Sequence, residues 1–212
     1  MRFLSFFSLL LASVAIASPI SFPKSQAADS TDLITRTPVA STYVDSAAYS
    51  LAIAAHNSLT KNTYYYFTLE WPSGVLIRDD DKETPDELKQ LVQRLGFDHI
   101  GLVVGYITER EGKKVKGKPL EIARDFKAVV YHMVKIDSET KETKAIHHTY
   151  DPTPGKGKDA GLILKWGGQT TKKKDSTVKT AGTDYVANGH STYSVDSNNC
   201  NDFVTAIKKK VQ

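Results

Sequence analysis

The pattern of apolar and polar positions predicts two helices early in the chain. Residues 43–59 are rich in alanine and carry apolar residues at helical spacing, which predicts the first helix. The second helix is predicted to begin after Thr84, because Pro85 and Glu87 then supply a proline at the first helical position and a capping box. Apolar residues follow at helical spacing until Gly96, which is typical of a helix C-terminus.

From residue 97 onward the apolar pattern changes from a helical period to the alternation of strands. Strand-like segments occupy residues 63–71, 97–108, 126–136, 144–150 and 162–166. Short polar links between the later segments favour an antiparallel meander. Residues 167–197 are largely polar and give no assignable element.

The C-terminal segment 199–211 predicts one more helix, with a cysteine in its first turn. Its apolar residues recur at helical spacing, at Cys200, Phe203, Val204, Ile207 and Val211. Asn198 or Asn199 can cap the start of this helix. The predicted fold class is α+β: a central antiparallel β-sheet packed by this C-terminal cysteine-bearing helix and by the N-terminal helices.

The first residues have the layout of a secretory signal peptide. An arginine, an apolar run and small residues follow one another in residues 1–17, and cleavage is expected near Ala17 or Ser18. Residues 18–40, rich in Ser, Thr, Ala and Pro, are expected to be a flexible leader or pro-segment. No later run is long and apolar enough to cross a membrane. We therefore expect a secreted, extracellular protein in which residues 41–212 form a single domain.

Composition and charge exclude several classes of protein. With 212 residues, 40% of them hydrophobic and 25% charged, the chain suits one globular domain. A single cysteine excludes an internal disulfide framework and a thiolate cage for zinc or an iron–sulfur cluster. The net charge is +4, and lysines gather in residues 113–118, 172–174 and 208–210. Such runs are usually solvated, or they contact anionic surfaces weakly; without a recognition module, no nucleic-acid partner is expected.

The lone thiol of Cys200 has two interpretations. A thiol in the first turn of a helix faces unsatisfied backbone N–H groups and the positive end of the helix dipole, which favour the thiolate. An unpaired thiol is otherwise a liability in an oxidising compartment. The alternative is a core thiol, because Cys200 lies on the apolar side of its helix and free cysteine is among the most buried residue types.

A nucleophilic cysteine needs a base, and the histidines of the strands are the candidates. His99 shares a strand face with two glycines, which leave room for a neighbouring backbone or a ligand. His132 shares its face with valines, so it is an ionisable group among apolar side chains. His147 and His148 are adjacent in a strand, so one faces each side of the sheet.

Two short motifs, in this order, resemble a known family. The first is His99 with the strand that follows it (HIGLVVG), and the second is NCNDFV at residues 199–204. Together they resemble the circularly permuted branch of the NlpC/P60 papain-like superfamily. The N-C-x-x-F-V signature is similar to that of lecithin:retinol acyltransferase-like proteins, and N-C-N-x-F also resembles PPPDE-like peptidases. Residues 131–133 (YHM) are similar to the second histidine motif of the acyltransferase group.

The resemblance implies a permuted papain-like fold and a role for each site residue. Cys200 would be the nucleophile, His99 the base that takes and returns its proton, and His132 the third group, which orients the imidazole. His147 or His148 remain alternatives for that third group. Backbone N–H groups at the start of the cysteine helix, with the Asn199 side chain, would hold the oxyanion.

The implied function is acyl transfer through a thioester. We expect a secreted cysteine-dependent hydrolase or acyltransferase, of the peptidase, amidase or phospholipase type, acting on an amide, peptide or lipid ester. Such a mechanism needs no metal and no organic cofactor. The alternative is a catalytically silent secreted binding protein or toxin-like effector on the same scaffold, whose lysines meet an anionic surface.

Overall fold

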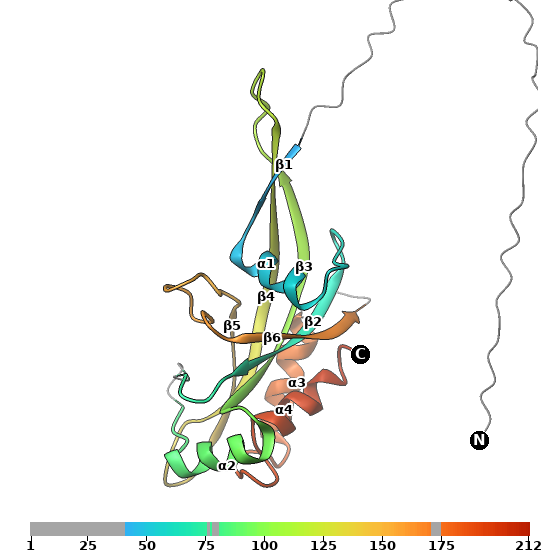
Figure 1. Ribbon diagram of the computed structural model, residues 1–212. Helices are drawn as coiled ribbons and strands as arrows, with labels where there is room; N and C mark the ends of the chain where they lie inside the picture. Colours follow the sequence, from blue (N-terminus) through green and yellow to red (C-terminus); the bar gives the residue numbers. More distant parts are fainter. Residues whose placement is uncertain (1–40, 76, 78–80, 171–174) are drawn as a thin grey trace, which may run out of the picture. The chain divides into compact units, whose positions relative to one another are not determined.

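The computed structural model describes residues 41–75, 77, 81–170 and 175–212 (Figure 1). The expected signal peptide (1–17) and leader (18–40) lie outside these residues, as does the lysine run 172–174. The described part of the expected domain is an α+β unit of one six-stranded sheet and four helices. None of these helices is long and apolar enough to cross a bilayer.

The sheet has the strand order β1-β4-β3-β2-β6, and β5 also pairs with β4. Its strands are β1 (Ser41–Asp45), β2 (Tyr64–Trp71), β3 (His99–Glu111), β4 (Leu120–Lys135), β5 (Thr143–Thr149) and β6 (Ile163–Thr170). Every pairing is antiparallel except that of β1 with β4, which is parallel. The predicted meander is confirmed for β3, β4 and β5. It is wrong for β6, which pairs with β2 rather than with β5.

A long hairpin of β3 and β4 forms the centre of the sheet. Its ladder continues to Glu111 opposite Ile122, so both strands extend into the segment between the two predicted strands. Gly105 allows the close approach of β4, because a Cβ atom there would collide with the carbonyl of Lys127. The expected room beside His99 is thus filled, at this glycine, by neighbouring backbone.

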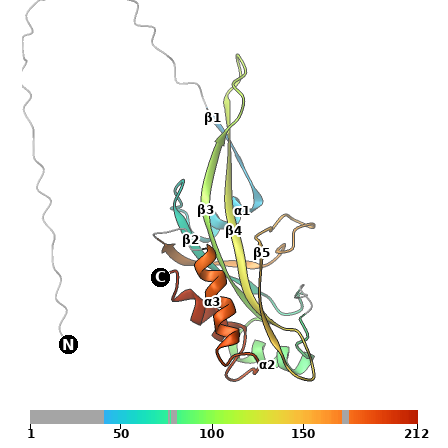
Figure 2. The ribbon, with the colours of Figure 1, turned by 180° about the vertical axis from the view of Figure 1, so that it is seen from behind.

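Helices cover both faces of the sheet, and each face has its own apolar core (Figure 2). Helix α1 (Ala47–Ala55) packs on one face, whereas α3 (Asp175–Ala187) and α4 (Cys200–Lys208) pack on the other. The apolar stripe of α4 is buried as predicted, with exposed fractions of 1–3% at Phe203, Val204 and Ile207. Burial of each of these side chains contributes about 1.5–3 kcal/mol.

Helix α2 (Pro85–Leu95) confirms the prediction from its cap residues. The Thr84 side chain accepts a hydrogen bond from the Glu87 N–H, and the Glu87 carboxylate accepts one from the Thr84 N–H at 2.7 Å. Gly96 ends the helix in the left-handed conformation, at φ 87°. The Glu87 carboxylate also pairs with the Lys135 ammonium at 2.8 Å, which ties the start of α2 to the end of β4.

Two segments differ from the predictions. The first helix spans residues 47–55 rather than 43–59, because Ser46 caps it and residues 41–45 form the edge strand β1. Helix α3 lies within the segment 167–197, to which the sequence assigned no element. Its Val178 side chain is fully buried in the core beneath α4.

Candidate active site

Two buried histidines meet at the end of the central hairpin. The backbone ladder of β3 and β4 ends with Leu102 opposite Tyr131, and His99 and His132 lie just beyond that end. His99 Nε2 is 2.9 Å from His132 Nδ1, which is a hydrogen bond between the two rings. Both side chains are fully buried. The two imidazole rings therefore contact each other just past the last paired residues of β3 and β4.

An indole ring fixes the orientation of this histidine pair. Trp71, the last residue of β2, lies directly opposite His99 in the sheet. Its ring meets the His99 ring edge to face at 4.9 Å between centroids and stacks on His132 at 5.5 Å. Aromatic packing of this kind restricts ring rotation, so the hydrogen bond between the histidines is held in one geometry.

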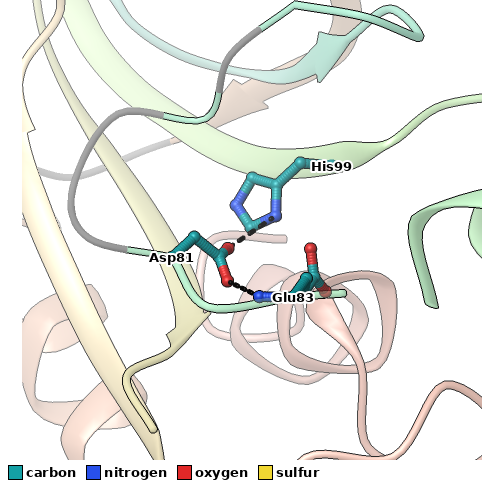
Figure 3. Close-up of side chains that lie close together, drawn as sticks. All are labelled: Asp81, Glu83 and His99. Carbon is teal, nitrogen blue, oxygen red and sulfur yellow. Dashed lines mark hydrogen bonds and ion pairs between the residues drawn. The ribbon is translucent and has the colours of Figure 1, made fainter. Parts of the chain in front are cut away.

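The other nitrogen of His99 faces a carboxylate that sequence reasoning did not find. Asp81 Oδ2 is 3.9 Å from His99 Nδ1, and both side chains are almost completely buried. Asp81 Oδ1 accepts hydrogen bonds from the backbone N–H groups of Glu83 and Lys135 at 3.2 and 3.3 Å. His99 therefore has His132 at one ring nitrogen and an acid at the other. Figure 3 shows Asp81 and Glu83 beside the His99 ring.

The two acids of this segment are buried next to each other, which changes their protonation. Burial raises the pKa of Asp81 to about 6. Burial, together with the neighbouring Asp81 carboxylate, raises the pKa of Glu83 to about 8. The neighbouring Tyr193 hydroxyl acts in the opposite direction and lowers the Glu83 pKa, although its geometry falls outside that of a standard hydrogen bond. Near neutral pH the pair therefore retains a proton that exposed carboxyls would have lost.

Helix α4 presents Cys200 at its N-terminus, as predicted. Asn199 is the cap residue, and its side-chain oxygen accepts hydrogen bonds from the N–H groups of Asn201 and Asp202 at 2.8 and 3.2 Å. The Asn199 amide group donates to the Val195 carbonyl at 2.8 Å. Of the two predicted cap residues, Asn198 and Asn199, it is Asn199 that caps the helix.

The Cys200 thiol is fully buried, and its environment favours the neutral form. Burial raises the pKa of this thiol well above its usual range, and the carboxyls of Glu83 and Asp81 raise it further. The backbone N–H groups of Ile100 and Asn201 act in the opposite direction, since they stabilise a thiolate. The sulfur therefore lies against the residue that follows His99 and near the same two acids.

The structure distinguishes the candidates for the third group. His132 contacts His99 directly, whereas His147 stacks on the Tyr131 ring. The His148 ring packs against His132 at 5.5 Å and lies 2.9 Å from Asp159. Of the three candidates, His132 thus makes a direct hydrogen bond to His99, whereas the contacts just described for His147 and His148 are with other residues.

A cleft of about 250 Å³ opens onto the acids of the site. Gly74, Leu88 and Asp98 line it together with Asp81 and Glu83. A larger cleft of about 420 Å³ lies farther along β3 and β4 and has none of the histidine or acid side chains of the site in its walls. Of these two clefts, the smaller one is therefore the one that reaches the acids of the site.

Comparisons with known proteins gave no match. No protein-family description, no curated protein and no solved structure matches this chain.

Proposed function

We propose that the protein is a secreted cysteine-dependent hydrolase or acyltransferase that acts on an amide, peptide or lipid ester. The observation that carries the proposal is the 2.9 Å hydrogen bond between His99 and His132, formed beside the strand residue that faces the Cys200 sulfur. A base held in place by a further group is the arrangement that activates a thiol nucleophile. The permuted papain-like identity of the fold is part of the same proposal.

The proposed reaction proceeds through a thioester. Because Nε2 of His99 is bonded to His132, the reaction requires Asp81 to move away from Nδ1, which then takes the Cys200 proton while the sulfur forms a bond to the substrate carbonyl carbon. The leaving group departs with the proton returned by His99. Water, or an alcohol or amine acceptor, then attacks the thioester, gives its proton to the imidazole and regenerates the thiol. His132 orients the imidazole. Backbone N–H groups at the start of α4, with the Asn199 side chain, would hold the oxyanion once the Asn199 amide group has left the Val195 carbonyl and its oxygen has left the N–H groups of Asn201 and Asp202.

The burial of the Cys200 thiol restricts when the proposed thioester reaction can take place. Because burial and the acids at positions 81 and 83 raise the pKa of Cys200, the thiol is neutral at pH 7 in this state. The proposed route for substrate is the cleft that these acids line. The reaction therefore requires that the two carboxyls be protonated or displaced when substrate binds.

Thiol alkylation tests the proposal. Iodoacetamide should modify Cys200 in the folded protein, and His99→Ala should slow the modification by more than about tenfold, in the range of general-base contributions. His132→Ala should slow it less, because this residue positions the base. His147→Ala is the matched control and should leave the rate unchanged, since His147 stacks on Tyr131. A rate that His99→Ala does not change would contradict the proposal.

A catalytically silent binding protein on the same scaffold is the second candidate. The observation that favours it is the complete burial of Cys200 in the core beneath α4. Lysines in the loop between β3 and β4 would then contact an anionic surface; they are Lys113, Lys114, Lys116 and Lys118, all exposed. Labelling of Cys200 only after unfolding in urea would favour this candidate over the enzyme.

Secretion is a separate part of the proposal. Residues 1–17 carry the signal-peptide pattern. Protein recovered from the medium of a secreting host should begin at residue 18 or close to it by N-terminal sequencing. A recovered chain that still begins at Met1 would contradict secretion by this route.

A further inference from the structure

We infer that Asp81, Glu83 and His99 form a binding site for one divalent transition-metal cation of the Zn²⁺ type. The site does not depend on the proposed cysteine chemistry. It is drawn in Figure 3, where the two carboxyl groups and the imidazole ring come together from the segment before α2 and from the first residue of β3.

The spacing of the three side chains suits a metal ion. One ligand atom from each side chain can be chosen so that all three lie within 4.8 Å of one another. Zn²⁺ lies about 2.0–2.2 Å from oxygen and nitrogen ligands, so in its usual tetrahedral arrangement two ligand atoms are about 3.3–3.6 Å apart. His99 Nδ1 and Asp81 Oδ2, at 3.9 Å, are close to this spacing, and the widest separation in the cluster has to contract by at most about 1.5 Å when the ion binds.

Buried carboxylate oxygens of Asp81 and Glu83 support the presence of a cation at this site. The Asp81 side chain is only 3% exposed, yet its Oδ2 has no hydrogen-bond donor among the described residues. Both carboxylate oxygens of Glu83 are buried without a hydrogen bond of standard geometry, with the Tyr193 hydroxyl beside them. Buried oxygens without donors are costly, and two adjacent carboxylates repel each other when ionised. A bound cation would satisfy these oxygens and offset the repulsion.

Hydrogen bonds from neighbouring groups orient the proposed ligand atoms, as outer-sphere hydrogen bonds do in metal sites. Asp81 Oδ1 is fixed by the N–H groups of Glu83 and Lys135, which leaves Oδ2 directed toward the imidazole. His99 Nε2 bonds to His132, which orients Nδ1 toward the acids. Metal-ligating histidines usually bind a second group through their other nitrogen. The cleft lined by Asp81 and Glu83 supplies a path for the ion.

The ligand set selects the class of ion. Two carboxylates and one imidazole suit Zn²⁺ and related transition metals, whereas Ca²⁺ and Mg²⁺ prefer oxygen ligands alone. Three protein ligands leave a coordination position for water. A metal on Nδ1 would also prevent His99 from accepting a proton there; this consequence, unlike the site itself, rests on the proposed function.

Calorimetric titration with Zn²⁺ tests the site, using purified chain without an affinity tag and treated with a chelator. We expect one Zn²⁺ per chain and a loss of affinity of more than about tenfold in Glu83→Gln. Asp159→Asn is the matched control, because it alters a buried acid that also lies beside a histidine. It should leave the affinity unchanged. Cys200→Ser should keep Zn²⁺ binding within about twofold.

The outcomes separate the metal site from the cysteine chemistry. Absence of Zn²⁺ binding, or an affinity that Glu83→Gln leaves unchanged, would overturn the metal site whether or not Cys200 is reactive. Loss of binding in Cys200→Ser would also overturn it, because the thiol would then be the ligand. Circular dichroism melting checks that each variant folds. If Glu83→Gln proves to be unfolded, Asp81→Asn is measured in its place, and the same loss of Zn²⁺ affinity is expected. Binding by a chain whose thiol is inert would support the metal site and refute the enzyme.

Discussion

The ion pair between Lys135 and Glu87 should be one of the most consequential single contacts for stability. The Lys135 side chain is 1% exposed, and its ammonium lies 2.9 and 2.8 Å from the two Glu87 oxygens. Glu87→Gln keeps the capping-box oxygen but removes the directly bonded counter-charge of the buried ammonium, which then interacts only with the Asp81 and Glu83 carboxyls at longer range. Removal of one partner of a buried pair costs about 3–5 kcal/mol, so we expect a loss of about 3 kcal/mol.

A double-mutant cycle measures this contact. Lys135→Met should cost less than Glu87→Gln, because the Glu87 carboxylate is 15% exposed and can be hydrated. The double variant should be close in stability to Lys135→Met alone. We therefore expect a coupling energy of at least about 2 kcal/mol from urea unfolding followed by circular dichroism. Additivity of the two single changes within about 0.5 kcal/mol would refute the reasoning.

Three further predictions concern the acids and the packing. An acid with a raised pKa holds its proton more tightly when folded, so the Glu83 carboxyl should lower stability as pH rises from about 4.5 to about 8. Melting temperatures of Glu83→Gln should fall less over that range; an equal fall in both proteins would contradict the shift. Phe203→Ala should cost about 3–5 kcal/mol in urea unfolding, because this ring is 1% exposed. Gly105→Ala should lower the melting temperature more than Gly112→Ala, since only the former places a Cβ against the Lys127 carbonyl; equal effects would argue against this packing.

Much of the fold could be predicted because local signals and burial agree. The cap residues of α2 and α4 mark their helices in the sequence, and both caps form as expected. The edge strand β1 could not be found in this way, because all five of its residues are exposed and it lacks the alternation of a half-buried strand. Helix α3 was not predicted for a similar reason, because its fully buried Val178 is surrounded by polar positions in the sequence.

The site was predictable only in part. His99 and His132 stand in strand-like segments with glycine or valine neighbours, so their burial can be foreseen. The burial of Asp81 and Glu83 cannot, because an acidic run usually forms a solvated surface. Their positions depend on distant contacts, such as the Lys82 N–H that donates to the Lys135 carbonyl at 2.7 Å.

The position of Trp71 allows its fluorescence to report on the histidine pair. Its indole touches both imidazole rings, and a protonated imidazole quenches indole fluorescence more strongly than a neutral one. The chain has one other tryptophan, Trp166, which stacks on His56 and can be replaced by phenylalanine. In a Trp166→Phe variant, the emission of Trp71 would report the charge state of the buried pair without any added label.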